Sequence, residues 1–187
     1  MSVGPLRLAF YKGITGKYGA IQFNPQLPHY YVKNEPSLKN FDGRWIPDNW
    51  KESNPSLSES DLASREGAIF MEITSAKDKN VYDWSKKIVF ALSITDIAKW
   101  LLVLEGVETN VELMHDPGAK SVSQGKVKKY VSVTSPKGLK LGCIVTASEV
   151  MSASAPPTRH VVPLTADEVI ALRCAMQSFI AKALGWL

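Results

Sequence analysis

Cysteine and histidine are scarce in this chain of 187 residues. Its two cysteines, Cys143 and Cys174, are too few for a disulfide scaffold, and with only three histidines no spacing typical of a zinc site occurs. The glycine-rich phosphate loops of nucleotide-binding proteins and the nucleophile elbow of hydrolases are also missing. His115–Asp116 precedes Pro117–Gly118, so a turn explains this pair better than a catalytic dyad does. We therefore expect no metal, no cofactor and no enzymatic activity.

Long apolar runs are missing as well. No segment approaches the roughly 20 apolar residues that span a bilayer, so we expect no membrane partner. The first residues, MSVGPLRL, carry neither the apolar core of a signal peptide nor an Arg/Ser-rich presequence. The content of 45% hydrophobic and 21% charged residues is ordinary for a globular protein. The length suits one domain over residues 1–187.

Apolar alternation predicts strands in both halves of the chain. The predicted strands are a pair within 6–25, then 29–33, 66–74, 81–92, 108–116, 126–134, 139–147 and 159–164. Residues 34–64 are rich in Pro, Asn, Ser and acids, which predicts a long surface loop. Strict alternation through 81–92 places a set of apolar residues toward the core: Tyr82, Trp84, Ile88, Phe90 and Leu92. Lys87 then points outward, whereas Lys86 must snorkel or sit at a bulge.

Two capping patterns predict where helices begin. Ser93 with Asp96, and Thr165 with Glu168, have the spacing of a capping box. The first helix is expected to end near Leu104, before Gly106. The last helix has a wide apolar stripe, which either packs against another subunit or is buried within its own chain. Strand sets that are each followed by a helix indicate an α+β fold.

Acidic residues are absent from two predicted hairpin regions that are rich in basic ones. Residues 120–140 hold six lysines, and residues 7–33 hold one arginine and three lysines. Tyr11, Tyr18 and Tyr130 lie among these cations. A basic sheet face with aromatic side chains suits single-stranded nucleic acid, because cations pair with phosphates and rings stack on bases. Lysines that merely solvate strands or protect sheet edges are the open alternative.

Residues 82–97, YDWSKKIVFALSITDI, resemble the corresponding segment of the Whirly family. Shorter pieces agree in order: FYKG near the start, SREG (64–67) before an apolar strand, HDP (115–117) before GKVKK (125–129), PLT (163–165) and LGW (184–186). Two features depart from plant members, namely ITGKYGAI after Lys12–Gly13 and the long acidic loop before Ser64. With the basic hairpins, these departures make the chain more similar to the kinetoplastid mitochondrial RNA-binding proteins of the same superfamily.

The resemblance implies a fold and a function. The fold would be two antiparallel four-stranded sheets packed across each other and braced by two helices. The chain would bind single-stranded or guide RNA with little sequence preference and promote RNA annealing during uridine insertion/deletion editing of mRNA. It would act in the mitochondrial matrix, in a heterotetramer with a paralogous subunit. Two alternatives stay open: a plant-type protein that binds single-stranded DNA in transcription or organelle genome maintenance, and a scaffold subunit that binds a paralogous RNA-binding chain.

We expect the nucleic-acid contacts to come from outward-facing cations and tyrosines of the strands. The candidates for phosphate contact are Arg7, Lys12, Lys17, Lys87, Lys126, Lys128 and Lys140. Tyr11 and Tyr130 are the candidates for shaping the surface or stacking on bases.

Overall fold

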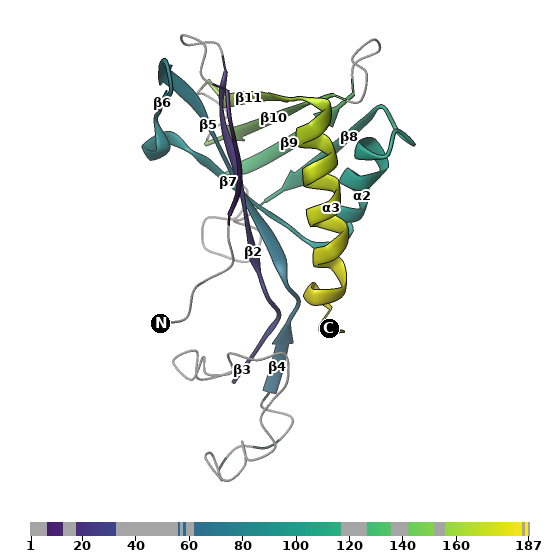
Figure 1. Ribbon diagram of the computed structural model, residues 1–187. Helices are drawn as coiled ribbons and strands as arrows, with labels where there is room; N and C mark the ends of the chain where they lie inside the picture. Colours follow the sequence, from purple (N-terminus) through teal and green to yellow (C-terminus); the bar gives the residue numbers. More distant parts are fainter. Residues whose placement is uncertain are drawn as a thin grey trace.

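Two antiparallel sheets cross each other in the computed structural model of the chain (Figure 1). The structure describes residues 7–12, 18–32, 56, 58, 62–116, 127–135, 142–151, 156–184 and 186. The first sheet consists of β1 (Leu8–Tyr11), β2 (Gly19–Gln26), β5 (Ala68–Asp78), β6 (Val81–Tyr82) and β7 (Ile88–Leu92), with β5 pairing β2 on one side and β6 and β7 on the other. The second sheet has the order β11 (Thr158–Leu164), β10 (Cys143–Val150), β9 (Lys128–Thr134) and β8 (Asn110–His115).

A two-stranded ribbon extends the first sheet away from the body of the molecule (Figure 1). β3 (His29–Val32) pairs with β4 (Leu62–Arg65), so the strand pairing of β2 with β5 resumes beyond a short interruption. The loop expected at 34–64 therefore ends in a strand at residue 62, and its residues 34–55 lie outside the described residues. At the base of the ribbon, the Gly67 N–H donates to the Ala183 carbonyl at 3.0 Å. A Cβ at Gly67 would lie 2.8 Å from the Ala183 Cα, so only glycine permits this approach.

Both predicted helices are present and begin at the predicted caps. α2 (Ile94–Leu104) follows Ser93, whose hydroxyl accepts from the Asp96 N–H while the Asp96 carboxylate accepts from the Ser93 N–H at 3.0 Å. α3 (Ala166–Ala183) begins with the equivalent box of Thr165 and Glu168. α2 ends where Gly106 takes a φ of 76°, a left-handed conformation that glycine adopts without strain. The two helices pack against each other on one side of the sheets (Figure 1).

One shared apolar core joins both sheets and both helices. Phe10, Ile21 and Met71 contribute from the first sheet, and Val131 and Val145 from the second. In α2, Trp100 is fully buried and meets the Phe23 ring edge-on, with 5.9 Å between ring centroids. The expected α+β architecture of two antiparallel sheets and two helices is confirmed, except that the first sheet has five strands among the described residues.

The predicted continuous strand over 81–92 is wrong. A short 3-10 helix, η2 (Trp84–Lys86), separates β6 from β7. Asp83 favours this turn, since its carbonyl accepts from the Lys86 N–H at 3.1 Å and its carboxylate accepts from the Ser85 hydroxyl. The turn changes which face the chain presents: Ile88 is buried in the core, whereas Tyr82 lies on the opposite, outer face. Lys86 sits at this irregularity with its side chain 76% exposed.

The second sheet is attached to this break through a buried histidine. His160 of β11 is 5% exposed, and its two ring nitrogens reach two segments of the first sheet. Nε2 lies 2.9 Å from the Lys86 carbonyl, and Nδ1 lies 2.7 Å from the Ser75 hydroxyl. Because a carbonyl only accepts, Nε2 carries the proton and Nδ1 accepts from Ser75. Thr74 adds a third contact to this region, donating to the Asp83 carbonyl at 2.7 Å.

Replacement of His160 therefore tests how much the junction contributes to stability. We expect His160→Ala to lower the free energy of unfolding by about 2–4 kcal/mol, since it leaves a cavity and two buried polar groups without partners. Arg159→Ala, at the exposed neighbouring position, should change it by no more than about 0.5 kcal/mol. Urea denaturation followed by circular dichroism measures both. Equal effects of the two substitutions would contradict a structural role for the junction.

Candidate nucleic-acid interface

Two tyrosines meet on the outer face of the first sheet, at the end where β6 pairs with β5. Tyr11 faces outward from β1, and Tyr18 directly precedes β2. Tyr82 of β6 meets Tyr11 with 5.4 Å between ring centroids. Tyr11 is 56% exposed and Tyr18 38%, so both present aromatic surface to solvent. We call Tyr11 and Tyr82 the tyrosine patch.

The residues beneath the tyrosine patch are small, which explains why the rings lie over the sheet. Strand register sets Tyr11 opposite Ala20, and Ala20 opposite Thr74. Tyr82 pairs with Ala76 in the same way. The pKa of Tyr82 is raised by burial and by the neighbouring Tyr11.

The carboxylate of Glu72 lies on the same outer face, two residues before Thr74 on β5. Glu72 of β5 accepts from the Lys87 ammonium at 2.8 Å and from the Gln22 amide. Burial opposes ionisation of Glu72, but the hydrogen bonds from Lys87 and Gln22 and the charges of Lys87 and Arg7 outweigh it, so the pKa of this carboxyl is lowered. Arg7 and Glu72 line a hollow of about 490 Å³ in this face, together with Asn24, Pro25, Gln26 and Phe70.

The outer face of the second sheet carries a row of side chains that crosses all four strands. The register aligns Met114 with Tyr130, Tyr130 with Ser148, and Ser148 with Arg159. Tyr130 is 41% exposed and Met114 57%, and Arg159 is also exposed. Lys128 is exposed two residues before Tyr130 on the same face. The row thus combines cations with a ring that is accessible to a base.

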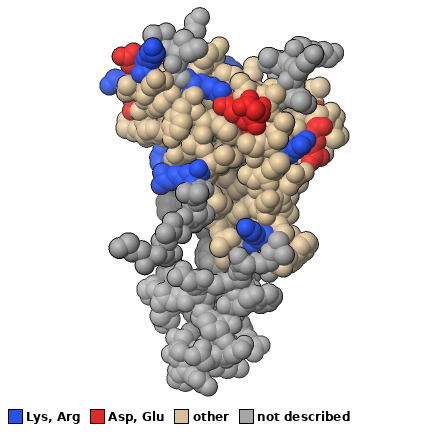
Figure 2. Space-filling view, in the orientation of Figure 1, with Lys and Arg blue, Asp and Glu red and all other residues tan. Residues whose placement is uncertain are grey.

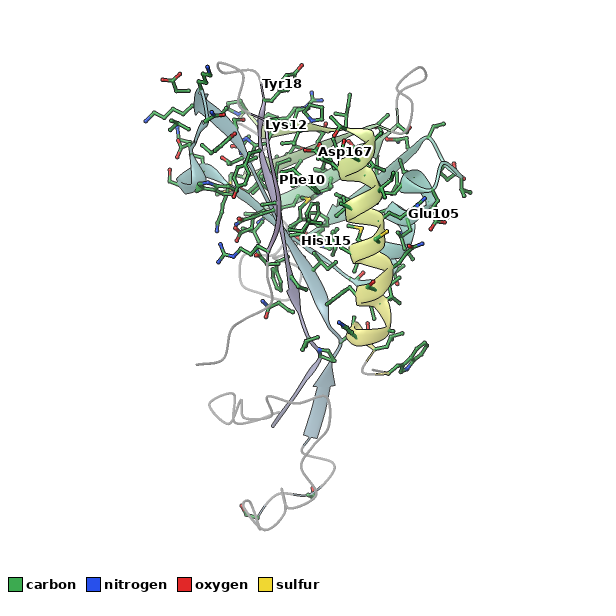
Figure 3. All side chains as sticks on the ribbon, viewed as in Figure 1. Phe10, Lys12, Tyr18, Glu105, His115 and Asp167 are labelled. Carbon is green, nitrogen blue, oxygen red and sulfur yellow. The ribbon has the colours of Figure 1, made fainter. Side chains whose placement is uncertain are left out.

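Two other cations are held by acids within the protein. Lys12 lies 2.6 Å from Glu168 at the start of α3, close to Asp167 in Figure 3. Lys129 points to the inner side of the second sheet, where it lies 3.1 Å from Glu149 and donates to the Val89 carbonyl at 2.9 Å. Lys87 is likewise paired with Glu72, so all three lysines have acidic partners. Lys12 and Lys87 are therefore weaker candidates for phosphate contact than their sequence positions predict.

The predicted site residues divide into three groups. Arg7, Tyr11 and Lys87 lie on the outer face of the first sheet, whereas Lys128 and Tyr130 lie on that of the second. Lys12 is paired with α3 as described. Lys17, Lys126 and Lys140 lie outside the described residues. On the side of the molecule shown in Figure 2, blue atoms form small separate groups on a mostly uncharged surface.

Sequence reasoning missed Tyr82 and Arg159 as interface candidates. Strict alternation assigns Tyr82 to the core because it ignores the η2 turn. Arg159 lies within a predicted strand whose residues Val162 and Leu164 point into the core. Because side chains alternate between the two faces of a strand, this pattern indicates that Arg159 faces outward. The second sheet meets the first next to Arg159, since the ring of His160 contacts the Lys86 carbonyl.

His115 of β8 contacts residues of α2 and β7. Its Nε2 lies 3.1 Å from the capping carboxylate of Asp96, and its ring stacks on Phe90 with 3.9 Å between centroids. The turn expected at Pro117–Gly118 lies outside the described residues. The described part of the chain holds no group of three or more His, Cys, Asp or Glu side chains arranged for a metal ion. Within that same part, every helix is too short or too polar to cross a membrane.

The lowered pKa of Glu72 predicts a stability change in acid. Because the pKa is below 4.5 in the folded state, ionised Glu72 stabilises the fold above that pH, and this contribution is lost as pH falls through the folded value. In Lys87→Met the ammonium partner is gone, so the loss of unfolding free energy between about pH 7 and about pH 3.5 should be smaller than in the wild type.

Urea denaturation at the two pH values measures this difference. Lys99→Met is the matched control, since it removes an exposed ammonium from α2. An identical acid loss in Lys87→Met and Lys99→Met would contradict the assigned ion pair.

Comparison with known proteins agrees with the fold. The family described as Whirly transcription factor matches residues 48–175. The chain is 32% identical over 136 residues to the mitochondrial single-stranded DNA-binding protein WHY2 of Arabidopsis thaliana, a match that covers 71% of this chain and 56% of WHY2. It is 36% identical over 70 residues to the chloroplastic single-stranded DNA-binding protein WHY1 of Solanum tuberosum, covering 37% of this chain and 25% of WHY1. The aligned part is thus little more than half of WHY2 and a quarter of WHY1.

Solved structures show the same architecture. The crystal structure of WHY3 from Arabidopsis thaliana superimposes with a TM-score of 0.74 at 23% identity, over 100% of this chain and 92% of WHY3. The Trypanosoma MRP1/MRP2 structure gives a TM-score of 0.53 at 9% identity, over 96% of this chain and 86% of that one, a similarity that shows the fold alone. The family match extends over most of the chain and includes α2, the first part of α3, the whole second sheet, and β5, β6 and β7 of the first sheet. The chain therefore belongs to the Whirly family.

Proposed function

We propose that this chain binds single-stranded nucleic acid, and DNA in particular, across the outer faces of its two sheets. The tyrosine patch, with Arg7 and Lys87 on the same face, is the observation that carries the proposal. The row that contains Tyr130 and Arg159 supplies the same combination on the second sheet.

The chemistry of the two faces suits a strand with unpaired bases. Stacking of a base on an aromatic ring contributes about 1–3 kcal/mol and tolerates any base, because every base has a π-face. Cations near the rings attract the phosphates and release counterions. The separate cationic groups and the exposed rings favour a strand that follows the sheet surface with little sequence preference.

Similarity to named relatives supports DNA as the ligand and an organelle as the location. WHY2 and WHY1 are both named single-stranded DNA-binding proteins, and WHY2 is named mitochondrial. We propose by analogy that this chain acts in mitochondria on single-stranded DNA, in transcription or genome maintenance.

Guide-RNA binding with RNA annealing for uridine insertion/deletion editing is the second candidate. Lys128, the exposed lysine of β9, favours this candidate. A cation that contacts only phosphates leaves the bases free to pair with a second strand. An RNA-binding chain would share the same sheet surfaces, so the two candidates differ in the ligand and not in the location of the interface.

Competition between DNA and RNA oligomers of matched sequence separates the two candidates. We expect the DNA oligomer to bind more tightly, and the logarithm of affinity to fall linearly with the logarithm of salt concentration, by roughly 0.7 per phosphate contact. Fluorescence anisotropy at several salt concentrations measures both quantities. Tighter RNA binding together with faster annealing of complementary RNAs would favour the editing role, and a flat salt response would contradict nucleic-acid binding through phosphates.

Variants of the interface complete this experiment. Tyr11→Ala should weaken binding about 5- to 100-fold through lost stacking. Lys128→Gln should reduce the slope of log affinity against log salt by the amount expected for about one phosphate contact. Lys99→Gln removes the same charge from the exposed face of α2 and serves as the control. The proposed interface is wrong if Lys99→Gln matches the effect of Lys128→Gln.

Association with further subunits is a separate proposal that rests on the helical layer. Leu102 of α2 is 40% exposed and Ile170 of α3 is 46% exposed. Beside α3, an apolar hollow of about 310 Å³ lies against the first sheet, lined in part by Leu8, Met176 and Phe179. Exposed apolar surface of this kind is typical of protein interfaces, which supports an oligomer of this chain or of this chain with a paralogue.

Light scattering after gel filtration tests the association. We expect the chain to elute at a multiple of its 20.6 kDa mass, and Ile170→Glu to lower that multiple. Val81→Glu, at a 51% exposed position of β6, is the control and should leave the mass unchanged. If the chain is monomeric alone and assembles only after mixing with a paralogue, a hetero-oligomer is favoured, and a monomer under both conditions would contradict the proposal.

A further inference from the structure

The hollow on the outer face of the first sheet combines groups that are suited to more than a phosphate. Its volume is about 490 Å³, which is large enough for a nucleobase. Its lining contains a guanidinium, a carboxylate, two carboxamides and an aromatic ring. A surface that only attracted phosphates would not need the carboxylate, because it would repel them.

Glu72 presents acceptors that are fixed in place. One carboxylate oxygen accepts from Lys87 and the other from Gln22, so the side chain is held from both sides. Each oxygen of an ionised carboxylate has about two acceptor positions, so both oxygens keep capacity for a donor that enters the hollow. The carboxylate can therefore accept two hydrogen bonds side by side from one ligand.

Asn24 is the second acceptor at this hollow. Its side-chain oxygen is buried and receives no hydrogen bond within the described part of the chain. A buried acceptor without a partner is unfavourable, and rotation of the Asn24 amide toward the hollow would let this oxygen accept from a ligand donor. Arg7 supplies the opposite chemistry at the same hollow, since its guanidinium only donates.

Phe70 provides an apolar wall beside these polar groups. It is paired with Asn24 in the register of β2 and β5, and Glu72 is paired with Gln22. Phe70 and Glu72 are two residues apart on β5, so their side chains lie on the same face of the sheet. A base that stacks against the ring would bring its edge toward the carboxylate and the guanidinium.

We propose that this hollow is a nucleobase subsite that prefers guanine. This inference rests on the proposed function and specifies one position within it. Guanine presents two adjacent donors, N1–H and the N2 amino group, which match the two oxygens of Glu72 and leave an amino hydrogen for Asn24. Its O6 and N7 acceptors match the donors of Arg7. Adenine and cytosine place an acceptor beside their single amino group, and thymine has one N–H between two carbonyls, so each would set an acceptor against the carboxylate.

The test uses thymidine tracts that carry one central substitution. We expect a tract with a central dG to bind about tenfold more tightly than the same tract with inosine, because inosine lacks only the N2 amino group. The uniform thymidine tract measures general binding in the same anisotropy assay. Equal affinities for the dG and inosine tracts, with the thymidine tract still bound, would overturn the guanine subsite and leave the proposed function standing. A loss of binding to all tracts would overturn both.

Glu72→Gln shows whether the preference comes from this hollow. The amide presents a donor where the carboxylate accepts, so the ratio of dG to inosine affinity should fall to about one. Glu112→Gln makes the same chemical change at an exposed position of β8 and should keep the ratio. Thermal unfolding verifies that both variants are folded. An unchanged ratio in Glu72→Gln would show that the preference does not arise here.

Discussion

The two hydrogen bonds of His160 are the constraint on which the arrangement of the two sheets depends. A buried imidazole is costly unless both nitrogens are satisfied, and here one partner is the Ser75 hydroxyl and the other the Lys86 carbonyl. Both partners belong to the first sheet or its η2 turn, whereas His160 belongs to the edge of the second. The crossing of the sheets and the break between β6 and β7 are therefore stabilised by one side chain.

This break determines which side chains reach solvent. Without η2, alternation would send Tyr82 into the core together with Ile88 and Phe90. With the turn, Tyr82 packs on Tyr11 over the small residues of the outer face, and the apolar residues of β7 still fill the core. The tyrosine patch is thus a consequence of a local turn, which Asp83 and Ser85 favour and the second sheet secures.

The basic composition of the chain does not produce a continuous basic surface on the side of the molecule shown in Figure 2. Lys12 and Lys129 are used inside the protein, where Glu168 and Glu149 neutralise them. Arg159 and Lys128 lie near the exposed ring of Tyr130 on the second sheet, and Lys87 holds a carboxylate on the first. Recognition by such a surface depends on rings and hydrogen-bonding edges as much as on net charge, which is why the hollow beside Glu72 can discriminate between bases.

The sequence alone determined the periodic features of this protein. Alternation located most strands and correctly placed Tyr130 on the outer face of its strand, with the neighbouring Val131 in the core. The capping boxes at Ser93 and Thr165 located both helix starts. These signals act over a few residues, so they can be recognised in the sequence. Only the tertiary structure decided the face of Tyr82, the pairing of β4 with β3, and the partners of Lys12 and His160. Each of these depends on groups far apart in the chain or on a turn that resets alternation, and local periodicity carries no information about such contacts.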